Sequence, residues 1–175
     1  MGANVIYKCS KCGKKYWAQE GFGMLFPLVY EETLQKAKDG ELGHQMQELA
    51  LNTKNVAIDA ELKVYYCGKC NHWESDTCYS LYAPNFDKPV PEVVPSIWKE
   101  IGVKCEERLF DYDAAEYVTE WELKNYYHLI RRYIHKCPKC KSRMHIATKK
   151  ELDNLRCPDC GGEKDKEFVG FMNWD

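Results

Sequence analysis

Four Cys-x-x-Cys pairs constrain this chain more than any other feature of its sequence. They use all but two of the ten cysteines in the 175 residues, and they are Cys9/Cys12, Cys67/Cys70, Cys137/Cys140 and Cys157/Cys160. Two residues between thiols place both sulfurs on one side of a tight turn, and two facing turns supply the tetrahedral set of thiolates that zinc prefers. The sequence therefore predicts two zinc ions, each held by four of these eight cysteines.

The spacing between the pairs predicts which of them share an ion. Sixteen residues separate Cys140 from Cys157, a spacing typical of four-cysteine zinc sites, so we expect the third and fourth pairs to form one site. The first and second pairs would form the other, although 54 residues lie between Cys12 and Cys67. Because long loops add little closure entropy, these 54 residues are expected to form an insertion at the tip of the first site.

The residue after each second cysteine supports metal-binding turns. Such a turn directs backbone N–H groups at the sulfurs and favours a positive φ just beyond it, which glycine and asparagine tolerate best. Gly13, Asn71 and Gly161 fit this requirement, whereas Lys141 breaks the pattern and is expected to loosen the third turn. The pairs begin at irregular intervals, so the turn is expected to be repeated without the unit around it.

Other uses of cysteine fit the sequence less well. Four disulfides are typical of a secreted chain, and the N-terminus has no basic stretch leading into an apolar core; we therefore expect a cytoplasmic protein. A thioredoxin-like redox pair usually opens a helix, but strand-like residues follow these pairs. Cys78 and Cys105 are expected to be buried apolar residues, and His72 and His135 to lie outside the sets of ligands.

The remaining residues predict an α+β fold. Helices are expected over 27–39 and 41–51, forming a helical hairpin (about 27–52) inserted into the first metal module, and strands over 57–66, 75–82 and 116–124. Pro84, Pro89, Pro91 and Pro95 indicate an extended connector. We therefore expect a module at 1–83, a connector and strand region at 84–125, and a second module at 126–175. No apolar run is long enough to cross a membrane.

Charge is unevenly distributed along the chain. Its net charge is −2, yet residues 124–160 carry ten basic and three acidic side chains, a balance of +7. Tyr126, Tyr127 and Tyr133 lie among these basic residues. Such a mixture suits contact with phosphates and stacking on bases, so this region is expected to bind nucleic acid or a protein partner; the alternative is a solvated face of a small module.

The metal turns resemble those of the zinc-ribbon and rubredoxin-like superfamily. The matching segments are Tyr7-Lys8-Cys9-Ser10-Lys11-Cys12-Gly13, Cys137-Pro138-Lys139-Cys140 and Cys157-Pro158-Asp159-Cys160-Gly161. The resemblance covers about half of the chain and implies small β-hairpin modules around a tetrahedral ion, many of which contact nucleic acid or protein. It is specific for metal binding and not for an activity, because function resides in sites and not in folds.

Three functions are compatible with these features. The sequence favours a non-enzymatic protein with two structural zinc sites that acts as an interaction module. Rubredoxin-like electron transfer is the alternative, because four thiolates bind iron in the same geometry. An enzyme is disfavoured, since catalytic zinc keeps an open coordination position and no catalytic triad or His-Glu-x-x-His motif occurs.

Overall fold

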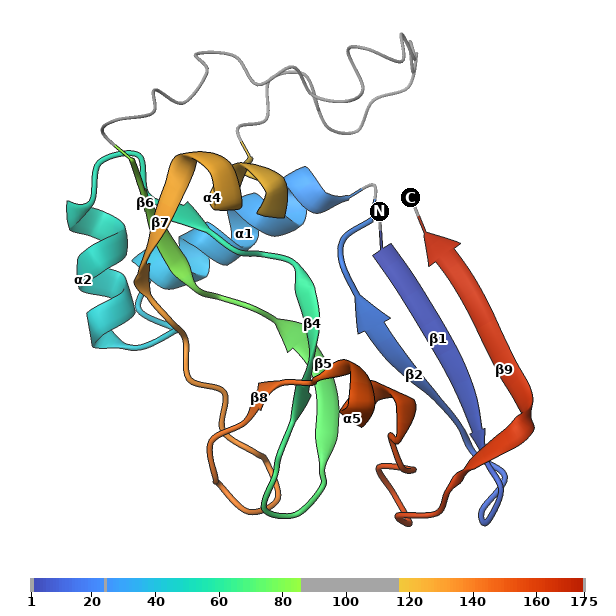
Figure 1. The fold of residues 1–175 in the computed structure, drawn as a ribbon. Helices are drawn as coiled ribbons and strands as arrows, with labels where there is room; N and C mark the ends of the chain where they lie inside the picture. Colours follow the sequence, from blue (N-terminus) through green and yellow to red (C-terminus); the bar gives the residue numbers. More distant parts are fainter. Residues whose placement is uncertain (1, 24, 86–116, 175) are drawn as a thin grey trace, which may run out of the picture. The chain divides into compact units, whose positions relative to one another are not determined.

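The fold was taken from a computed structural model, which describes residues 2–23, 25–85 and 117–174, with 166–174 as backbone alone. The described part is a mixed α/β structure with small antiparallel sheets (Figure 1). It separates into two compact units, each assembled from distant segments. Unit 1 contains residues 1–25, 61–78 and 133–175, and unit 2 contains residues 26–60 and 79–132.

The first sheet of unit 1 joins the two ends of the chain. Strands β1 (Gly2–Cys9) and β2 (Lys15–Glu20) form a hairpin, and β9 (Lys164–Trp174) pairs with the other edge of β1, giving the order β2-β1-β9. All pairings are antiparallel; Ile6 lies opposite both Trp17 and Gly170. The first Cys-x-x-Cys pair therefore lies in the turn of this hairpin.

The second sheet of unit 1 has the same plan. Strands β4 (Leu62–Tyr66) and β5 (Trp73–Thr77) form a hairpin around the second Cys-x-x-Cys pair, and β8 (His145–Ile146) pairs with the other edge of β4. The expectation that only the turn is repeated is wrong for the first two turns, because each of these belongs to a hairpin whose first strand also pairs with a later strand. The repeat is hard to see in sequence because its two halves are nested and not consecutive.

An apolar cluster joins the two sheets of unit 1. Tyr16, Val64, Trp73 and Leu155 are buried in it. The rings of Tyr16 and Trp73 lie 5.6 Å apart, and the backbone N–H of Gln19 in β2 donates to the Ser75 hydroxyl in β5 (2.8 Å). Because Tyr16 comes from β2, Val64 from β4 and Trp73 from β5, the cluster packs the two hairpins against each other.

Unit 2 contains the predicted helical hairpin. Helix α1 (Phe26–Lys38) is followed by a turn in which Gly40 has a φ of +85°, and then by α2 (His44–Asn52). Both predicted helices are confirmed, with α2 beginning three residues later than expected because Gly40–Gly43 form a turn. The helices pack on each other within unit 2, together with a sheet of order β3-β6-β7 made of β3 (Ala57–Ile58), β6 (Leu81–Pro84) and β7 (Tyr127–Arg131).

Three strand predictions need correction. The stretch 57–66 is split into β3 and β4, and 75–82 is covered by the separate strands β5 and β6, so each stretch passes from one unit to the other. In the described part of the stretch predicted as a strand over 116–124, residues 117–124 form no strand: α4 (Glu120–Tyr126) begins there, with Thr119 and Glu122 forming a reciprocal capping box. This cap satisfies the first free N–H groups of a helix, and it outweighs the alternation of polar and apolar residues.

Some predictions fall outside the described residues. The connector beyond residue 85, including three of its four prolines, and Cys105 belong to this group. The compact units also differ from the expected order of 1–83, 84–125 and 126–175, because both ends of the chain belong to unit 1. Within the described part of the chain, no helix has the length and apolar character needed to span a membrane.

Candidate metal centres

The four Cys-x-x-Cys turns share one backbone geometry. In each, the N–H of the residue after the second cysteine donates to the carbonyl of the first, at 2.8–2.9 Å. The N–H of the first cysteine donates to the carbonyl of the residue two positions after the second, again at 2.8–2.9 Å. Both bonds wrap the chain around the thiols, so the sulfurs of a pair point to the same side.

The predicted positive φ occurs in all four turns. The values are +72°, +58°, +59° and +68°, at Gly13, Asn71, Lys141 and Gly161. Lys141 therefore does not loosen the third turn: its N–H donates to the carbonyl of Cys137 at 2.9 Å, the same distance as in the first and fourth turns. The turn imposes its geometry on lysine, at an energetic cost of roughly 1–2 kcal/mol.

The eight cysteines form two groups of four. Site 1 consists of Cys9, Cys12, Cys157 and Cys160, and site 2 of Cys67, Cys70, Cys137 and Cys140. Within each group the sulfurs all lie within 4.8 Å of one another. All eight predicted ligands are therefore brought together, and among the described residues these are the two groupings of metal-binding side chains with such geometry.

The expected partnership between the pairs is wrong. The first pair joins the fourth and the second joins the third, because β9 pairs with β1 and β8 pairs with β4. The register sets Lys164 opposite Cys9 and His145 opposite Tyr66. The sixteen residues after Cys140 therefore lead from site 2 to site 1 and do not fold back to close a single site.

The distances between sulfurs fit a tetrahedral ion. Cys9 and Cys160 Sγ are 3.5 Å apart, and Cys12 and Cys157 Sγ 3.8 Å; in site 2 the Cys67–Cys140 and Cys70–Cys137 distances are both 3.5 Å. A disulfide bond is about 2.05 Å long, whereas four sulfurs about 2.3 Å from one ion lie about 3.8 Å apart. The chain thus offers two sites that can each hold one metal ion.

Hydrogen bonds to sulfur prepare the thiols for a cation. The backbone N–H of Cys12 approaches Cys9 Sγ at 3.4 Å and lowers the pKa of Cys9 to about 6. In site 2, hydrogen bonds from Ser142 lower the pKa of Cys140 to about 6. A backbone N–H from Lys14 also favours the thiolate of Cys12, but burial and the neighbouring sulfurs outweigh it and raise the pKa of Cys12 to about 12. Four thiolates therefore need a cation among them.

Close packing surrounds site 1. A Cβ atom added at Gly162 would lie 2.9 Å from Cys9 Sγ and 2.8 Å from Lys11 Cβ, so only glycine fits there. The indole N–H of Trp73 donates to the Arg156 carbonyl at 2.6 Å and fixes the chain just before Cys157. Neither Gly162 nor Trp73 was predicted from the sequence as part of the site; the second glycine after Cys160 is a signal that could have identified Gly162.

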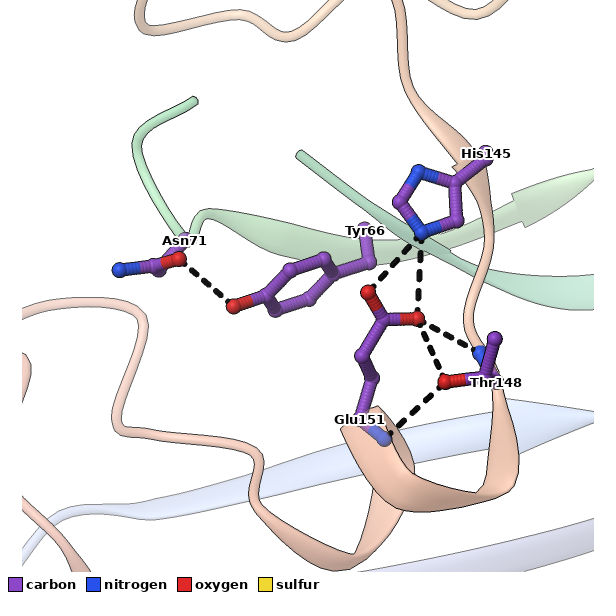
Figure 2. Close-up of polar contacts among 5 residues, drawn as sticks. All are labelled: Tyr66, Asn71, His145, Thr148 and Glu151. Carbon is purple, nitrogen blue, oxygen red and sulfur yellow. Dashed lines mark hydrogen bonds and ion pairs between the residues drawn. The ribbon is translucent and has the colours of Figure 1, made fainter. Parts of the chain in front are cut away.

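A polar network fixes the segment that leads from site 2 to site 1 (Figure 2). The carboxylate of Glu151 accepts from the backbone N–H and hydroxyl of Thr148 (2.8 and 2.9 Å) and contacts His145 Nε2 at 3.0 Å. The N–H of Thr148 and the other hydrogen bonds lower the pKa of Glu151. These contacts begin α5 (Lys149–Asp153), and the Thr148-x-x-Glu151 spacing is a capping signal that could have been read from sequence.

His72 and His135 lie outside the two cysteine groups, as predicted from the sequence. His135 is buried, stacks on Tyr65 with ring centres 3.5 Å apart, and places Nε2 3.3 Å from the Cys78 carbonyl. His72 Nε2 lies 3.8 Å from a carboxylate oxygen of Glu74. Cys78 is buried as predicted. With four thiols at each site, neither imidazole is needed as a ligand.

The fold and the two sites define a mixed α/β protein with two potential four-cysteine metal centres. Comparison of the chain with known protein families, with curated proteins and with solved structures returns no match.

Proposed function

We propose that this chain is a non-enzymatic protein whose unit 1 consists of two nested zinc ribbons, each closed by one structural zinc ion, and that it acts as an interaction module. The observation that carries the proposal is the convergence of four turns of one geometry into two groups of four thiols. Cys9, Cys12, Cys157 and Cys160 would hold one ion, and Cys67, Cys70, Cys137 and Cys140 the other.

The closed ligand set supports a structural role. Four sulfurs fill a tetrahedral coordination shell, so no position is left for a water molecule or a substrate. The first cysteine of each turn is at most 4% exposed, which limits access to the ion further. The metal would therefore cross-link the two turns of each site. The thiolates would be its ligands, and backbone N–H groups would stabilise their negative charge.

The position of the sites supports a dependence of folding on metal. Site 1 would connect the hairpin at one end of the chain to the segment before β9, and site 2 would connect the β4–β5 hairpin to the segment before β8. Structural zinc contributes roughly 10–16 kcal/mol of apparent binding free energy per site in small domains. That is more than the net stability of most domains, about 5–15 kcal/mol.

Elemental analysis of the purified chain tests the proposal. The chain should be expressed without a polyhistidine tag in medium that contains both iron and zinc. We expect two zinc ions per chain and a colourless protein. A red protein that contains iron and absorbs visible light through thiolate-to-iron charge transfer would favour the alternative, rubredoxin-like electron transfer. Fewer than one metal ion per chain, or sulfurs oxidised to disulfides, would contradict both.

Single substitutions assign the ions to their sites. Cys12→Ser and Cys70→Ser each remove an exposed thiol from one site, and each is expected to lower the zinc content from two ions towards one. Cys78→Ala is the matched control, because Cys78 is buried but belongs to neither group, and it should retain both ions. Equal zinc content in all three variants would contradict the assignment.

A further inference from the structure

We propose that the turns of site 2 form a binding surface for the phosphate backbone of nucleic acid. The surface, here called the basic rim, consists of Lys69, Lys136, Lys139, Lys141 and Arg143. The inference rests on the proposed function, because the two turns that carry these residues would be held together by the ion at site 2. It goes further by assigning a surface and a class of partner.

The fold gathers the basic rim at one site. Lys69 lies inside the turn between Cys67 and Cys70, and Lys139 lies at the same position between Cys137 and Cys140. Lys136 and Arg143 flank the latter turn and face each other as an antiparallel bridge. Lys141 has a positive φ just after the same turn. All five side chains are exposed.

Within the described part of the chain, four of the five cations of the basic rim have no carboxylate partner. Segments 62–73 and 133–150 contain no aspartate or glutamate. Three nearby acidic residues face histidines: Glu74 approaches His72, Asp76 approaches His135, and Glu151 approaches His145. A fourth, Asp159, pairs with Lys14 of site 1 and also interacts electrostatically with Lys139. Lys69, Lys136, Lys141 and Arg143 form no ion pair with another described residue, and Lys139 donates to the carbonyl of Pro158 (2.6 Å).

Site 1 has the same architecture and also carries lysines, among them Lys8 and Lys11, but carboxylates lie among its cations. Its two turns pair with each other through Lys14 and Asp159, whose Nζ and Oδ2 atoms are 2.7 Å apart. Arg156 and Glu163, which flank the turn from Cys157 to Cys160, form a second ion pair with 3.7 Å between a guanidinium nitrogen and a carboxylate oxygen. The two sites therefore differ in the carboxylates that pair with the cations around their turns.

The metal centre alone does not account for five cations. One divalent ion with four thiolates would carry a net charge of −2. A centre with the same charge at site 1 is surrounded by both basic and acidic side chains, so the charge of the metal centre does not by itself require five cations. Five cations leave an excess of three positive charges at site 2. A positive surface of this kind attracts polyanions and raises their rate of association.

The composition of the basic rim favours nucleic acid over protein. Lysine is depleted in protein interfaces, whose centres are aromatic and apolar, whereas lysine and arginine are the main contacts to phosphate oxygens. The neighbouring aromatic rings have other partners: Tyr65 stacks on His135, and the Tyr66 hydroxyl donates to Asn71 (2.7 Å). Binding is therefore expected to follow phosphate charge, with little preference for base sequence.

A salt titration of the zinc-loaded full chain tests the proposal. The probe is a fluorescein-labelled duplex DNA of about 20 base pairs, followed by anisotropy between 50 and 200 mM NaCl. With all five cations on phosphates, the plot of log K against log [NaCl] should have a slope of about −4.5. A duplex of scrambled sequence should bind equally well.

Variants matched by position separate the basic rim from general charge. Lys69→Gln combined with Lys136→Gln removes two rim cations and should reduce the steepness of the slope by about 1.8. Lys11→Gln combined with Lys8→Gln changes the corresponding positions of site 1 and should leave the slope nearly unchanged. Zinc content is measured on every variant, and two ions are expected in each.

The outcomes distinguish the inference from the proposed function. A chain that holds two zinc ions but fails to bind DNA at 50 mM NaCl overturns the inference alone. Loss of zinc from the rim variant would also overturn it, because these cations would then serve the metal centre. Equal binding of polyglutamate would overturn it as well, because the basic rim would then attract any polyanion and not nucleic acid in particular. A chain without metal would contradict the proposed function itself.

Discussion

The Sγ atoms of Cys9 and Cys160 lie 3.5 Å apart although 151 positions separate these residues in the chain. The sulfurs of Cys67 and Cys140 are equally close across 73 positions. Site 2 is therefore nested inside site 1 in sequence, and residues from both ends of the chain meet at site 1. Each site closes a long loop, so a metal ion would remove much of the freedom of the unfolded chain.

Gly162→Ala should damage site 1. The added Cβ would approach Cys9 Sγ to 2.9 Å and Lys11 Cβ to 2.8 Å, so the sulfur or the turn has to shift. Overpacking of this kind costs about 1–3 kcal/mol, and a displaced sulfur binds its ion less tightly. Competition with a coloured chelator should show one of two zinc ions released earlier than in the unsubstituted chain.

Gly68→Ala is the control for this effect. Gly68 lies in a turn of site 2, and a Cβ there meets no atom within 4 Å. Zinc release from this variant should match that of the unsubstituted chain. Equal sensitivity of the two variants would show that glycine is needed for turn geometry in general and not for packing against Cys9.

Lys141→Gly should stabilise the protein. Lys141 has a φ of +59°, which costs a residue with a Cβ roughly 1–2 kcal/mol. Glycine removes this cost, but its greater conformational freedom in the unfolded chain offsets part of the stabilisation. The net increase is expected to be about 0.5–1 kcal/mol, measured as a rise of a few degrees in the melting temperature at fixed zinc concentration. Lys136→Gly, at an ordinary φ, should instead lower it.

Glu151→Gln should weaken the segment between the two sites. The pKa of Glu151 is lowered, so the contribution of its charge is present above the ordinary value of 4.5 and is lost as pH falls through the lower pKa of the folded state. At pH 7 the full contribution is present. Glutamine retains the capping geometry, so the loss is limited to roughly 0.5 kcal/mol for this partly exposed group.

Salt provides the check on that interpretation. The difference in melting temperature between the Glu151→Gln variant and the unsubstituted chain should shrink in 0.5 M NaCl, because salt screens exposed charges. A difference that does not change with salt would assign the effect to hydrogen-bond geometry and not to charge.

Thr119→Val should destabilise unit 2. Its hydroxyl oxygen accepts from the N–H of Glu122 at the start of α4, and loss of such a cap costs about 1 kcal/mol. Valine has nearly the same shape and favours strands, so a strand at 116–124 would tolerate it. Thr119→Ser keeps the hydroxyl and should behave like the unsubstituted chain.

Much of the site was predictable from sequence because its chemistry is local. Two residues between cysteines determine a turn, and the structure gives all four turns the same hydrogen bonds. The positive φ at Gly13, Asn71 and Gly161 also follows from residue type. The prediction for Lys141 was wrong because the intrinsic preference of lysine for negative φ is overridden by the two backbone hydrogen bonds that hold its turn.

The pairing of the turns was not predictable from spacing. It depends on which strand lies beside β1 and which lies beside β4, and these contacts join residues far apart in the chain. The sixteen residues between Cys140 and Cys157 could close one site or lead to another. The direction is set by β8 and by the Thr148–Glu151 cap that begins α5, neither of which the spacing reveals.

We infer that each ion bridges an early and a late Cys-x-x-Cys pair, with site 2 nested inside site 1 in sequence. NMR of the chain loaded with cadmium-113 tests this pairing, because each ion is correlated with the β protons of its own cysteines. We expect one ion correlated with Cys9, Cys12, Cys157 and Cys160, and a second with Cys67, Cys70, Cys137 and Cys140. A single ion correlated with both Cys9 and Cys67, or with both Cys137 and Cys157, would contradict it.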